Sequence, residues 1–320
     1  MKKRLAPIFI VFLGLIFTAY SQNPYNVKAA SEEEKIPQKT LSKEEKFVSE
    51  NFPFINMADW QPGMKFIIEP DYLDIDNRLD LKPRKNSSYS EQPLQKDYAW
   101  KIVELKEVKN STNKSYFTFE CEGQKLIYVS PLNLSDLKKS LSFSHINHLV
   151  YLKDIDKSKE LLLNKQLYIL TERWLKENEA KGEYIHSQKF VPVTITNIGM
   201  GETDGPVKII FKTADGTENF LNVRFSGINT SSKIFGIDFV DAFSFDNPRD
   251  LYPEISDEMW TMIQNGRVKI GMTKTEAELA WGKPKEINTD IYGSSSQEQW
   301  VYSSSSYIYF ENGKLSAIQN

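Results

Sequence analysis

Residues 255–284 read ISDEMWTMIQNGRVKIGMTKTEAELAWGKP, and this stretch decides the fold of the C-terminal part of the chain. Ser256 can cap a first helix, and Gly266 can end it. Thr273 and Glu276 have the spacing of a capping box, in which each side chain bonds a backbone amide left free at a helix start. The Gly-Lys-Pro run ends this second helix, because proline cannot continue it. The stretch therefore predicts two helices joined by a tight turn.

Three short strands are expected after these helices. They are QWVY (299–302), SYIYF (306–310) and LSAI (315–318), and a polar, serine-rich loop precedes them. The ENGK segment at 311–314 has the Asn-Gly centre of a two-residue hairpin turn. We therefore expect a C-terminal ααβββ domain at 251–320.

Parts of this domain resemble a known family. The runs IGMT (270–273), LAWGKP (279–284), QWVY and YFENGKL (309–315) are similar to the SmpA/OmlA family, whose BamE-like members are small lipoproteins of the outer-membrane β-barrel assembly machine. The resemblance covers roughly the last 55–65 residues, one domain's length. It implies a BamE-like interaction fold rather than a given activity, since fold does not determine function. The chain departs from the family in lacking a lipid-bearing cysteine near its N-terminus and in carrying about two further domains upstream.

The first 21 residues have the pattern of a secretory signal peptide. Basic residues at 2–4 precede an apolar run at 5–17, and small residues at 19–21 suit cleavage before Gln22. An apolar run of about thirteen residues is short for crossing a bilayer, so we do not expect a membrane-spanning protein. The cleavage site has no cysteine, so no lipid anchor is expected either. We predict an exported protein, either periplasmic or extracellular.

Composition limits the classes of partner. Cys121 is the only cysteine, so no intramolecular disulfide can form even after export. Removing the three signal-peptide charges from the 40 basic side chains leaves 37 against 43 acidic ones, a net charge of −6. This mildly acidic balance argues against nucleic acid or anionic lipid as the main partner. The remaining 299 residues are enough for about two or three domains.

Residues 22–58 are expected to form a flexible tether and one short helix. The tether is polar and has little to bury. The helix is predicted at 43–51, because Ser42 and Glu45 form a second capping-box pair and Pro53 closes the element.

The middle of the chain contains an internal repeat. Three segments of the first copy align with three of the second, namely FIIEPDYL (66–73) with YILTERWL (168–175), KIVELKEV (101–108) with VPVTITNI (191–198), and FECEG (119–123) with FKTADG (211–216). In the last pair one residue is inserted. Alternation of apolar and polar residues favours half-buried antiparallel strands in each copy.

The repeat predicts two small β-modules, at 59–135 and 164–250, in an α+β chain. Each copy reads as a strand, a long polar excursion and three further strands, and we expect SH3-like barrels or rolled sheets. The excursions, 74–97 and 176–187, are expected to be surface loops. Residues 136–163 are expected to be a connector, with a helix near its start.

Metal binding finds little support in the sequence. His145 and His148 would share one face of a helix and offer two imidazoles to a metal, but ordinary polar connector residues explain them as well. His186 has no nameable partner. The acidic cluster at 71–80 begins like a calcium loop, yet Arg78 stands where a third ligand belongs. We expect a solvated loop there, with no metal and no cofactor.

Catalytic motifs are also missing from the sequence. No Gly-x-Ser-x-Gly elbow occurs, and no histidine is placed to act as a base. The glycine pair at 199–201 is too short for a phosphate loop. Cys121 falls in an alternating strand and suits a core position better than a nucleophile. We therefore predict no catalytic residue and no enzymatic activity.

Aromatic residues crowd the predicted C-terminal strands. In SYIYF the two tyrosines share one face, and the isoleucine and phenylalanine share the other. A sheet that is apolar on both faces leaves one face free for a partner. The candidate binding residues are Trp300, Tyr302, Tyr307 and Tyr309. Strand aromatics are more often core, which would take Trp300 and Tyr309 inward, with Tyr302 as a third candidate for the core.

These features favour a non-enzymatic exported envelope protein that contacts an envelope protein or cell-wall component through its β-modules and BamE-like domain. The main alternative is a hydrolase of envelope polymers with SH3-like targeting modules, and it lacks a visible nucleophile–base pair. A secreted enzyme inhibitor is a further alternative, by analogy with tandem BamE-like folds in inhibitors of β-lactamases.

Overall fold

The computed structural model describes residues 40–69, 82–85, 88–89, 98–140, 145–146, 148–176, 184–202, 205–230, 236–292 and 295–319. The expected signal peptide and nearly all of the expected tether lie outside the described residues, as does the acidic cluster at 71–80. Among the described helices, none has the length and apolar character needed to cross a membrane. The fold mixes α and β structure, with sheets that are mostly antiparallel.

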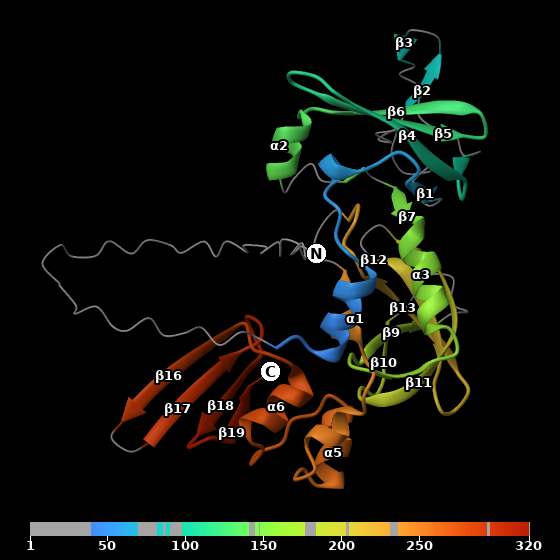
Figure 1. Ribbon diagram of the computed structural model, residues 1–320. Helices are drawn as coiled ribbons and strands as arrows, with labels where there is room; N and C mark the ends of the chain where they lie inside the picture. The colour runs from blue at the N-terminus through green and yellow to red at the C-terminus, as the bar shows by residue number, and fades with distance from the viewer. Residues whose placement is uncertain are drawn as a thin grey trace, which may run out of the picture. The chain divides into compact units, whose positions relative to one another are not determined.

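Two sheets have the same strand order. Figure 1 labels most of their strands. Within the described residues, the first module is a seven-stranded sheet of order β3-β2-β6-β5-β4-β1-β7. Its strands are β1 (Lys65–Ile68), β2 (Lys82–Lys85), β3 (Ser88–Tyr89), β4 (Ile102–Asn110), β5 (Ser115–Cys121), β6 (Gln124–Ser130) and β7 (Leu149–Tyr151).

The second module has the order β10-β9-β13-β12-β11-β8-β15, with β14 paired to β13. Its strands are β8 (Gln166–Ile169), β9 (Arg173–Lys176), β10 (Tyr184–His186), β11 (Val191–Glu202), β12 (Gly205–Lys212), β13 (Glu218–Arg224), β14 (Ile237–Asp238) and β15 (Phe243–Ser244). Strand for strand, the order matches that of the first module. The repeat seen in the sequence is therefore a repeat of topology.

The repeat extends to single backbone groups. Trp100 and Phe190 precede the corresponding strands β4 and β11, and both have a left-handed backbone, with φ of 66° and 57°. The Trp100 N–H donates to the carbonyl of Ile68 at 2.9 Å, and the Phe190 N–H donates to that of Ile169 at 2.6 Å. Such a conformation is uncommon for aromatic residues, so its recurrence at equivalent places supports a true structural repeat.

One aligned segment was predicted one residue out of register. The sequence alignment paired Phe66 with Tyr168, whereas the structure makes Leu167 the counterpart of Phe66. Phe66 lies opposite Val103 in its sheet, and Leu167 lies opposite Val193. Phe66 and Leu167 are fully buried, but Tyr168 points to the other face and is only half-buried. A slip of one residue reverses the face of every side chain in a strand, so buried pairing decides the register.

The sheets are larger than the sequence predicted. The two polar excursions were expected to be loops, but they contain β2, β3 and β10, which extend one edge of each sheet. The expected connector at 136–163 is likewise only partly a connector. The segment begins inside α2 (Leu134–Lys139) and contains β7, which joins the first sheet. It also contains α3 (Leu152–Leu162), whose Ile155 and Leu162 pack in the core of the second module. Short polar strands at a sheet edge lack the hydrophobic signal that identifies central strands.

The first helix is α1 (Lys43–Asn51), and its predicted capping box between Ser42 and Glu45 is confirmed. It packs on the second module although the first module follows it in the chain. Phe47 lies 5.6 Å from Phe239 in α4 (Phe239–Ala242) and 5.0 Å from Phe245, measured between ring centroids. Residues that precede the first module in the sequence therefore contribute to the core of the second module. The short helix η1 (Met57–Asp59) follows α1 in the chain.

The loop that follows β13 joins the two modules. Ile228 is 2% exposed and belongs to the first module's core, although its own strand belongs to the second. The Asn229 side chain accepts the Ile146 N–H at 2.6 Å and donates to the Ile146 carbonyl at 2.9 Å. It also donates to the carbonyl of Leu149. Three hydrogen bonds from one buried amide hold this loop against the end of the first sheet.

The C-terminal domain contains the two predicted helices and one strand more than predicted. Its elements are α5 (Asp257–Gln264), α6 (Lys274–Trp281), β16 (Glu286–Tyr292), β17 (Ser295–Val301), β18 (Tyr307–Glu311) and β19 (Lys314–Gln319). The Ser256 cap and the capping box of Thr273 with Glu276 are confirmed, as is the Asn-Gly hairpin. The expected serine-rich loop is wrong in part, because β16 and most of β17 occupy it, which makes the described order ααββββ.

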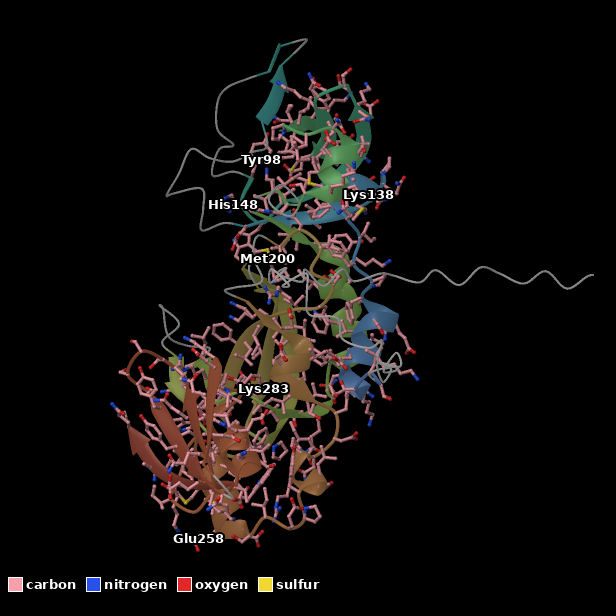
Figure 2. The ribbon with its side chains drawn as sticks, turned by 90° about the vertical axis from the view of Figure 1, so that its left-hand side faces the viewer. Tyr98, Lys138, His148, Met200, Glu258 and Lys283 are labelled. Atoms are coloured by element: carbon pink, nitrogen blue, oxygen red, sulfur yellow. The ribbon has the colours of Figure 1, made fainter. Side chains whose placement is uncertain are left out.

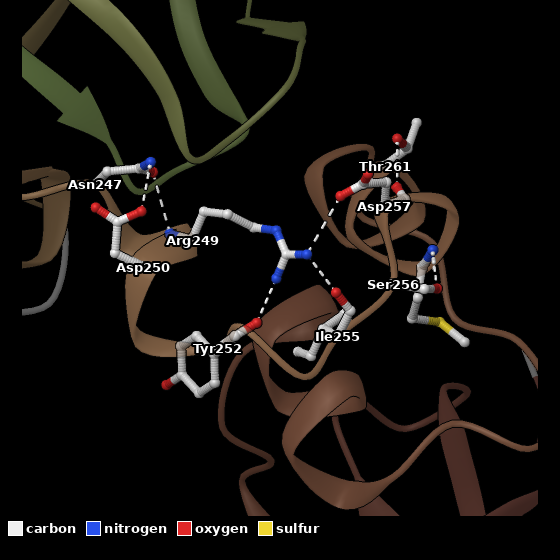
Figure 3. A network of polar contacts seen from close by, with 9 residues as sticks. Asn247, Arg249, Asp250, Tyr252, Ile255, Ser256, Asp257 and Thr261 are labelled. Atoms are coloured by element: carbon white, nitrogen blue, oxygen red, sulfur yellow. Dashed lines mark hydrogen bonds and ion pairs between the residues drawn. The ribbon is translucent and has the colours of Figure 1, made fainter.

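Arg249 organises the segment that leads into this domain, just after the second module (Figure 3). It lies in the short helix η4 (Pro248–Leu251), and its guanidinium donates to the carbonyls of Tyr252 and Ile255. The same group pairs with Asp257 at 3.3 Å and lies 5.1 Å over the ring of Trp260. One side chain thus fixes both the linking segment and the first turn of α5.

Candidate binding surface

Helices cover one face of the C-terminal sheet, and the described part of the chain leaves the other face uncovered. Ile308 and Phe310 are buried together with Trp300, whose ring lies 4.7 Å from that of Phe310. These side chains share a core with α5 and α6. Tyr307 and Tyr309 alternate with them and are only half-buried. The predicted division of this strand into two faces is therefore confirmed, and Trp300 belongs to the core.

A row of polar side chains crosses the uncovered face. The Asn288 amide donates to Gln299 Oε1 at 3.1 Å, and the Gln299 amide donates to the Tyr309 hydroxyl at 3.0 Å. That hydroxyl donates in turn to Gln319 Oε1 at 3.1 Å. The row contains one residue from each of the four strands, and it fixes the Tyr309 ring. We expected this face to be apolar, and the row shows that it combines aromatic rings with amides.

Tyr307 is the second half-exposed ring of this face. It lies opposite Val301 on β17 and Gln319 on β19. Its hydroxyl donates to the carbonyl of Ser304 at 2.8 Å, within the turn that precedes its own strand. Both tyrosine hydroxyls are therefore held in place, and a partner would meet two ordered rings.

Tyr302 does not belong to this face. Its hydroxyl donates to the carbonyl of Gly282 at 3.0 Å, and its ring meets the edge of Trp281 at 5.3 Å. Burial raises the pKa of the Tyr302 phenol well above its usual range. Tyr302 thus attaches the end of α6 to the sheet. Of the four candidate residues, the structure brings only Tyr307 and Tyr309 together on the uncovered face.

The two edges of this sheet differ. The β19 edge is covered near Leu315, whose N–H donates to the carbonyl of Met272 and whose carbonyl accepts the Gly271 N–H, both at 2.8 Å. Among the described residues β16 pairs with β17 alone, so its outer edge is open. Ile287 on β16 is 50% exposed. An open edge strand offers unpaired backbone groups to another strand.

An ion pair and a hydrogen bond hold side chains in place on the inner face of the same sheet. Lys274 of α6 pairs with Glu298, and the Trp300 indole donates to the other oxygen of that carboxylate at 3.1 Å. The hydrogen bond from Lys274 holds the pKa of Glu298 below its usual range. These contacts keep Trp300 in the core, so the uncovered face is presented on a firm support.

The histidines do not form the arrangement that their spacing allows. His145 and His148 precede β7 and lie outside any helix, so the predicted shared helical face does not form. His148 is buried with its Nδ1 atom 3.6 Å from a carboxylate oxygen of Glu69 (Figure 2). Among the described residues, no three His, Cys, Asp or Glu side chains come close enough to hold a metal. Cys121 is 1% exposed in the first core, and burial raises the pKa of its thiol.

No protein-family model, curated protein or solved structure matches this chain. The resemblances to SmpA/OmlA and to SH3-like modules therefore rest on the sequence patterns quoted above.

Sequence reasoning missed the amides of the uncovered face. Asn288 lies on β16, in a segment that was expected to be loop, and Gln299 and Gln319 received no role. The run EINTDIY at 286–292 puts Ile287, Thr289 and Ile291 on one face and Glu286, Asn288 and Asp290 on the other, which a strand would do. That alternation was the available signal. It would have predicted strand β16, and the pairing of β16 with β17 then brings Asn288 next to Gln299.

Proposed function

We propose that this chain is a non-enzymatic exported binding protein of the cell envelope, and that its BamE-like C-terminal domain holds an envelope protein. The observation that carries the proposal is the uncovered face of the C-terminal sheet. Tyr307 and Tyr309 present ordered rings there, beside amides that can bond a partner's polar groups. Surfaces with tyrosine and a polar surround are typical of protein contacts.

The open edge beside this face supports a protein partner over a cell-wall polymer. A strand added to β16 would bond its backbone and bring the partner's side chains next to the amide and tyrosine row. The exposed Ile287 adds apolar area at that edge. A cell-wall component remains the second outcome of the test below.

The test places a photo-crosslinking amino acid at Tyr307 or Tyr309 in cells that make the protein. We expect a discrete crosslinked species at both positions, with the partner identified by mass spectrometry. The matched control position is Tyr116, a half-buried tyrosine on β5 of the first module. Crosslinks of equal yield at all three positions, or none at the two C-terminal ones, would overturn the proposal. Recovery of glycan instead of protein would reassign the face to the cell wall.

A mutant arm separates binding from folding. Tyr307→Ala should weaken the crosslink at Tyr309 by about tenfold, equal to about 1.4 kcal/mol, while leaving the unfolding midpoint close to the wild-type value. Tyr116→Ala should leave the crosslink unchanged. A Tyr307→Ala protein that simply unfolds would mean that this ring is structural, and the proposal would then fail.

A further inference from the structure

A groove opens at one end of the second module. It has a volume of about 500 Å³. Its lining includes Trp174, Gln188, Pro192, Asp215, Thr217 and Asn219. These residues come from β9, the segment before β11, the first residues of β11, the turn between β12 and β13, and β13 itself. The volume lies within the range of about 300–1,000 Å³ that small-molecule sites occupy.

Two polar atoms of the groove lining lack a partner. Trp174 is 1% exposed and Asn219 is 2% exposed. Among the described residues, neither the Nε1–H donor of Trp174 nor the Oδ1 acceptor of Asn219 has a hydrogen-bond partner. The Asn219 amide nitrogen is used, because it donates to the carbonyl of Thr217 at 3.4 Å. Buried polar groups are hydrogen-bonded as a rule, so one free donor and one free acceptor together point to a missing group.

The two atoms belong to neighbouring side chains. Lys176 lies opposite Asn219, and Leu175 lies opposite Phe220, in the pairing of β9 with β13. Side chains alternate along a strand, so Trp174 and Asn219 face the same side as diagonal neighbours. The two side chains therefore lie on the same face of this strand pair.

The first module has different side chains at the positions equivalent to two groove residues. Tyr98 is the counterpart of Gln188, since each lies two residues before the left-handed Trp100 or Phe190. The Tyr98 hydroxyl donates to Gln124 on β6, on the opposite wall (Figure 2 labels Tyr98). The equivalent positions in the second module hold Gln188 and Thr217, and both line the groove.

The floor of the groove changes in the same way. Leu126 lies opposite Phe119 in the first module, and Asn219 lies opposite the equivalent Phe211 in the second. Leu126 is fully buried and has no polar group to satisfy. The first module thus has a Tyr98–Gln124 hydrogen bond and an apolar Leu126 where the second has Gln188, Thr217 and the polar Asn219. Both differences favour a ligand in the second module.

We propose that the groove of the second module binds a saccharide, with one sugar hydroxyl between Trp174 and Asn219. A hydroxyl oxygen can accept from the Trp174 Nε1–H while its proton goes to Asn219 Oδ1. A carboxylate can only accept and an ammonium can only donate, so neither satisfies both atoms. A peptide group has both functions but carries them on separate atoms that point in opposite directions.

The rim supplies the other contacts that a sugar needs. One oxygen of Asp215 accepts the Thr213 hydroxyl at 2.6 Å and the Thr217 N–H at 3.1 Å, and these bonds hold the pKa of Asp215 below its usual range. Within the described residues no hydrogen bond to its other oxygen is seen, and that oxygen can accept a sugar hydroxyl. The Gln188 amide nitrogen already donates to Asn265 Oδ1 at 3.4 Å, and its carbonyl oxygen can accept a sugar hydroxyl. Pro192 offers an apolar surface to the C–H face of a sugar ring.

The binding test follows the Trp174 indole N–H in ¹H–¹⁵N spectra of the mature chain, residues 22–320, and Trp174→Phe assigns the signal. The probes are trisaccharides of N-acetylglucosamine, glucose and galactose, with trialanine as the peptide probe. We expect at least one trisaccharide to shift this signal saturably, with a dissociation constant below about 10 mM. Absence of a saturable shift with all three, or an equal shift with trialanine, would overturn the proposal.

Variants taken from the first module test the site itself. Gln188→Tyr and Asn219→Leu copy Tyr98 and Leu126, and each should weaken the best trisaccharide by about tenfold or more. Gln188 is exposed, so its variant keeps the test valid if Asn219→Leu fails to fold. Tyr98→Gln in the first module is the matched control and should leave binding unchanged. Binding that survives Gln188→Tyr would overturn the assignment. This inference shares the binding role proposed above but uses another surface, so the crosslinking test and this one fail separately.

Discussion

Phe190 and Trp100 occupy equivalent left-handed positions in the two modules, but only Phe190 has a partner from the C-terminal domain. The Phe190 ring stacks on Trp260 of α5, with centroids 5.4 Å apart, whereas Trp100 is 62% exposed. The backbone of Lys189, beside Phe190, donates to the carbonyl of Gln264 at 3.0 Å. The same structural position therefore contacts the C-terminal domain in the second module and lies at the surface in the first. We call the contact of Phe190 with Trp260 the domain joint.

This pair gives a matched test of the joint. Phe190→Ala should lower the free energy of unfolding by about 1–3 kcal/mol, because it removes an aromatic contact between the second module and α5. Trp100→Ala should change it by less than about 0.5 kcal/mol, as expected for a surface position. Both changes put alanine at a positive φ, so backbone strain cancels in the comparison. Urea unfolding followed by circular dichroism measures both, and equal losses would contradict the assigned role of Phe190.

Asp154 predicts a pH-dependent stability. The carboxyl is 3% exposed on α3, and burial raises its pKa from 3.8 to about 6, although a hydrogen bond from the Ser226 hydroxyl opposes the shift. Between about pH 4 and pH 6, the Asp154 carboxyl is therefore protonated in the folded state and ionised in the unfolded state. The corresponding stability is present below about pH 4 and is lost as the pH rises through about 6.

Asp154→Asn removes this titration while keeping the shape of the side chain. Its stability relative to wild type should rise from near zero at about pH 4 to about 1–3 kcal/mol at pH 7.5. Thermal unfolding across this range measures the difference. Asp156→Asn, two residues along on the exposed side of the same helix, is the matched control for the loss of a carboxylate from α3. A difference that stays constant with pH would show that Asp154 does not titrate in this way.

Asn229 should be needed to hold the two modules together. Asn229→Gly removes the three side-chain hydrogen bonds to Ile146 and Leu149 and leaves buried backbone groups unpaired. We expect a loss of about 2–4 kcal/mol in the free energy of unfolding. Glycine suits the φ of 58° at this position, so backbone strain does not add to the loss. Thr230→Ala, next in the chain, is the control and should cost less than half as much in the same urea titration.

Arg249 should resist replacement by lysine. Its planar guanidinium donates to two carbonyls and to Asp257, and an ammonium cannot reproduce this fork. We expect Arg249→Lys to cost about 1–2 kcal/mol and to speed proteolytic cleavage between residues 245 and 256. Lys269→Gln breaks an exposed pair with Glu258 and should cost less than about 0.5 kcal/mol. Equal cleavage rates in the two variants would refute the structural role of Arg249.

Much of the local structure follows from the sequence alone. The capping boxes at Ser42 and Thr273 and the hairpin turn at Asn312 lie where the sequence predicts them. These features depend on residues within four positions of one another, so a short stretch contains all the information they need. Alternation of side chains along a strand likewise predicted which residues of β18 share a face, but the expectation that Tyr309 points inward was wrong, because Ile308 and Phe310 are the buried pair.

The tertiary structure decided the rest. The register of β8, the docking of α1 on the second module and the strands within the polar excursions each depend on residues far apart in the chain. The groove of the second module is the clearest case. Trp174 and Asn219 become neighbours only when β9 pairs with β13, and the role of Gln188 emerges only when the two modules are compared position by position. Turns and helix caps depend on residues close together in the sequence, whereas the pairing of distant strands decides which side chains share a face of a sheet.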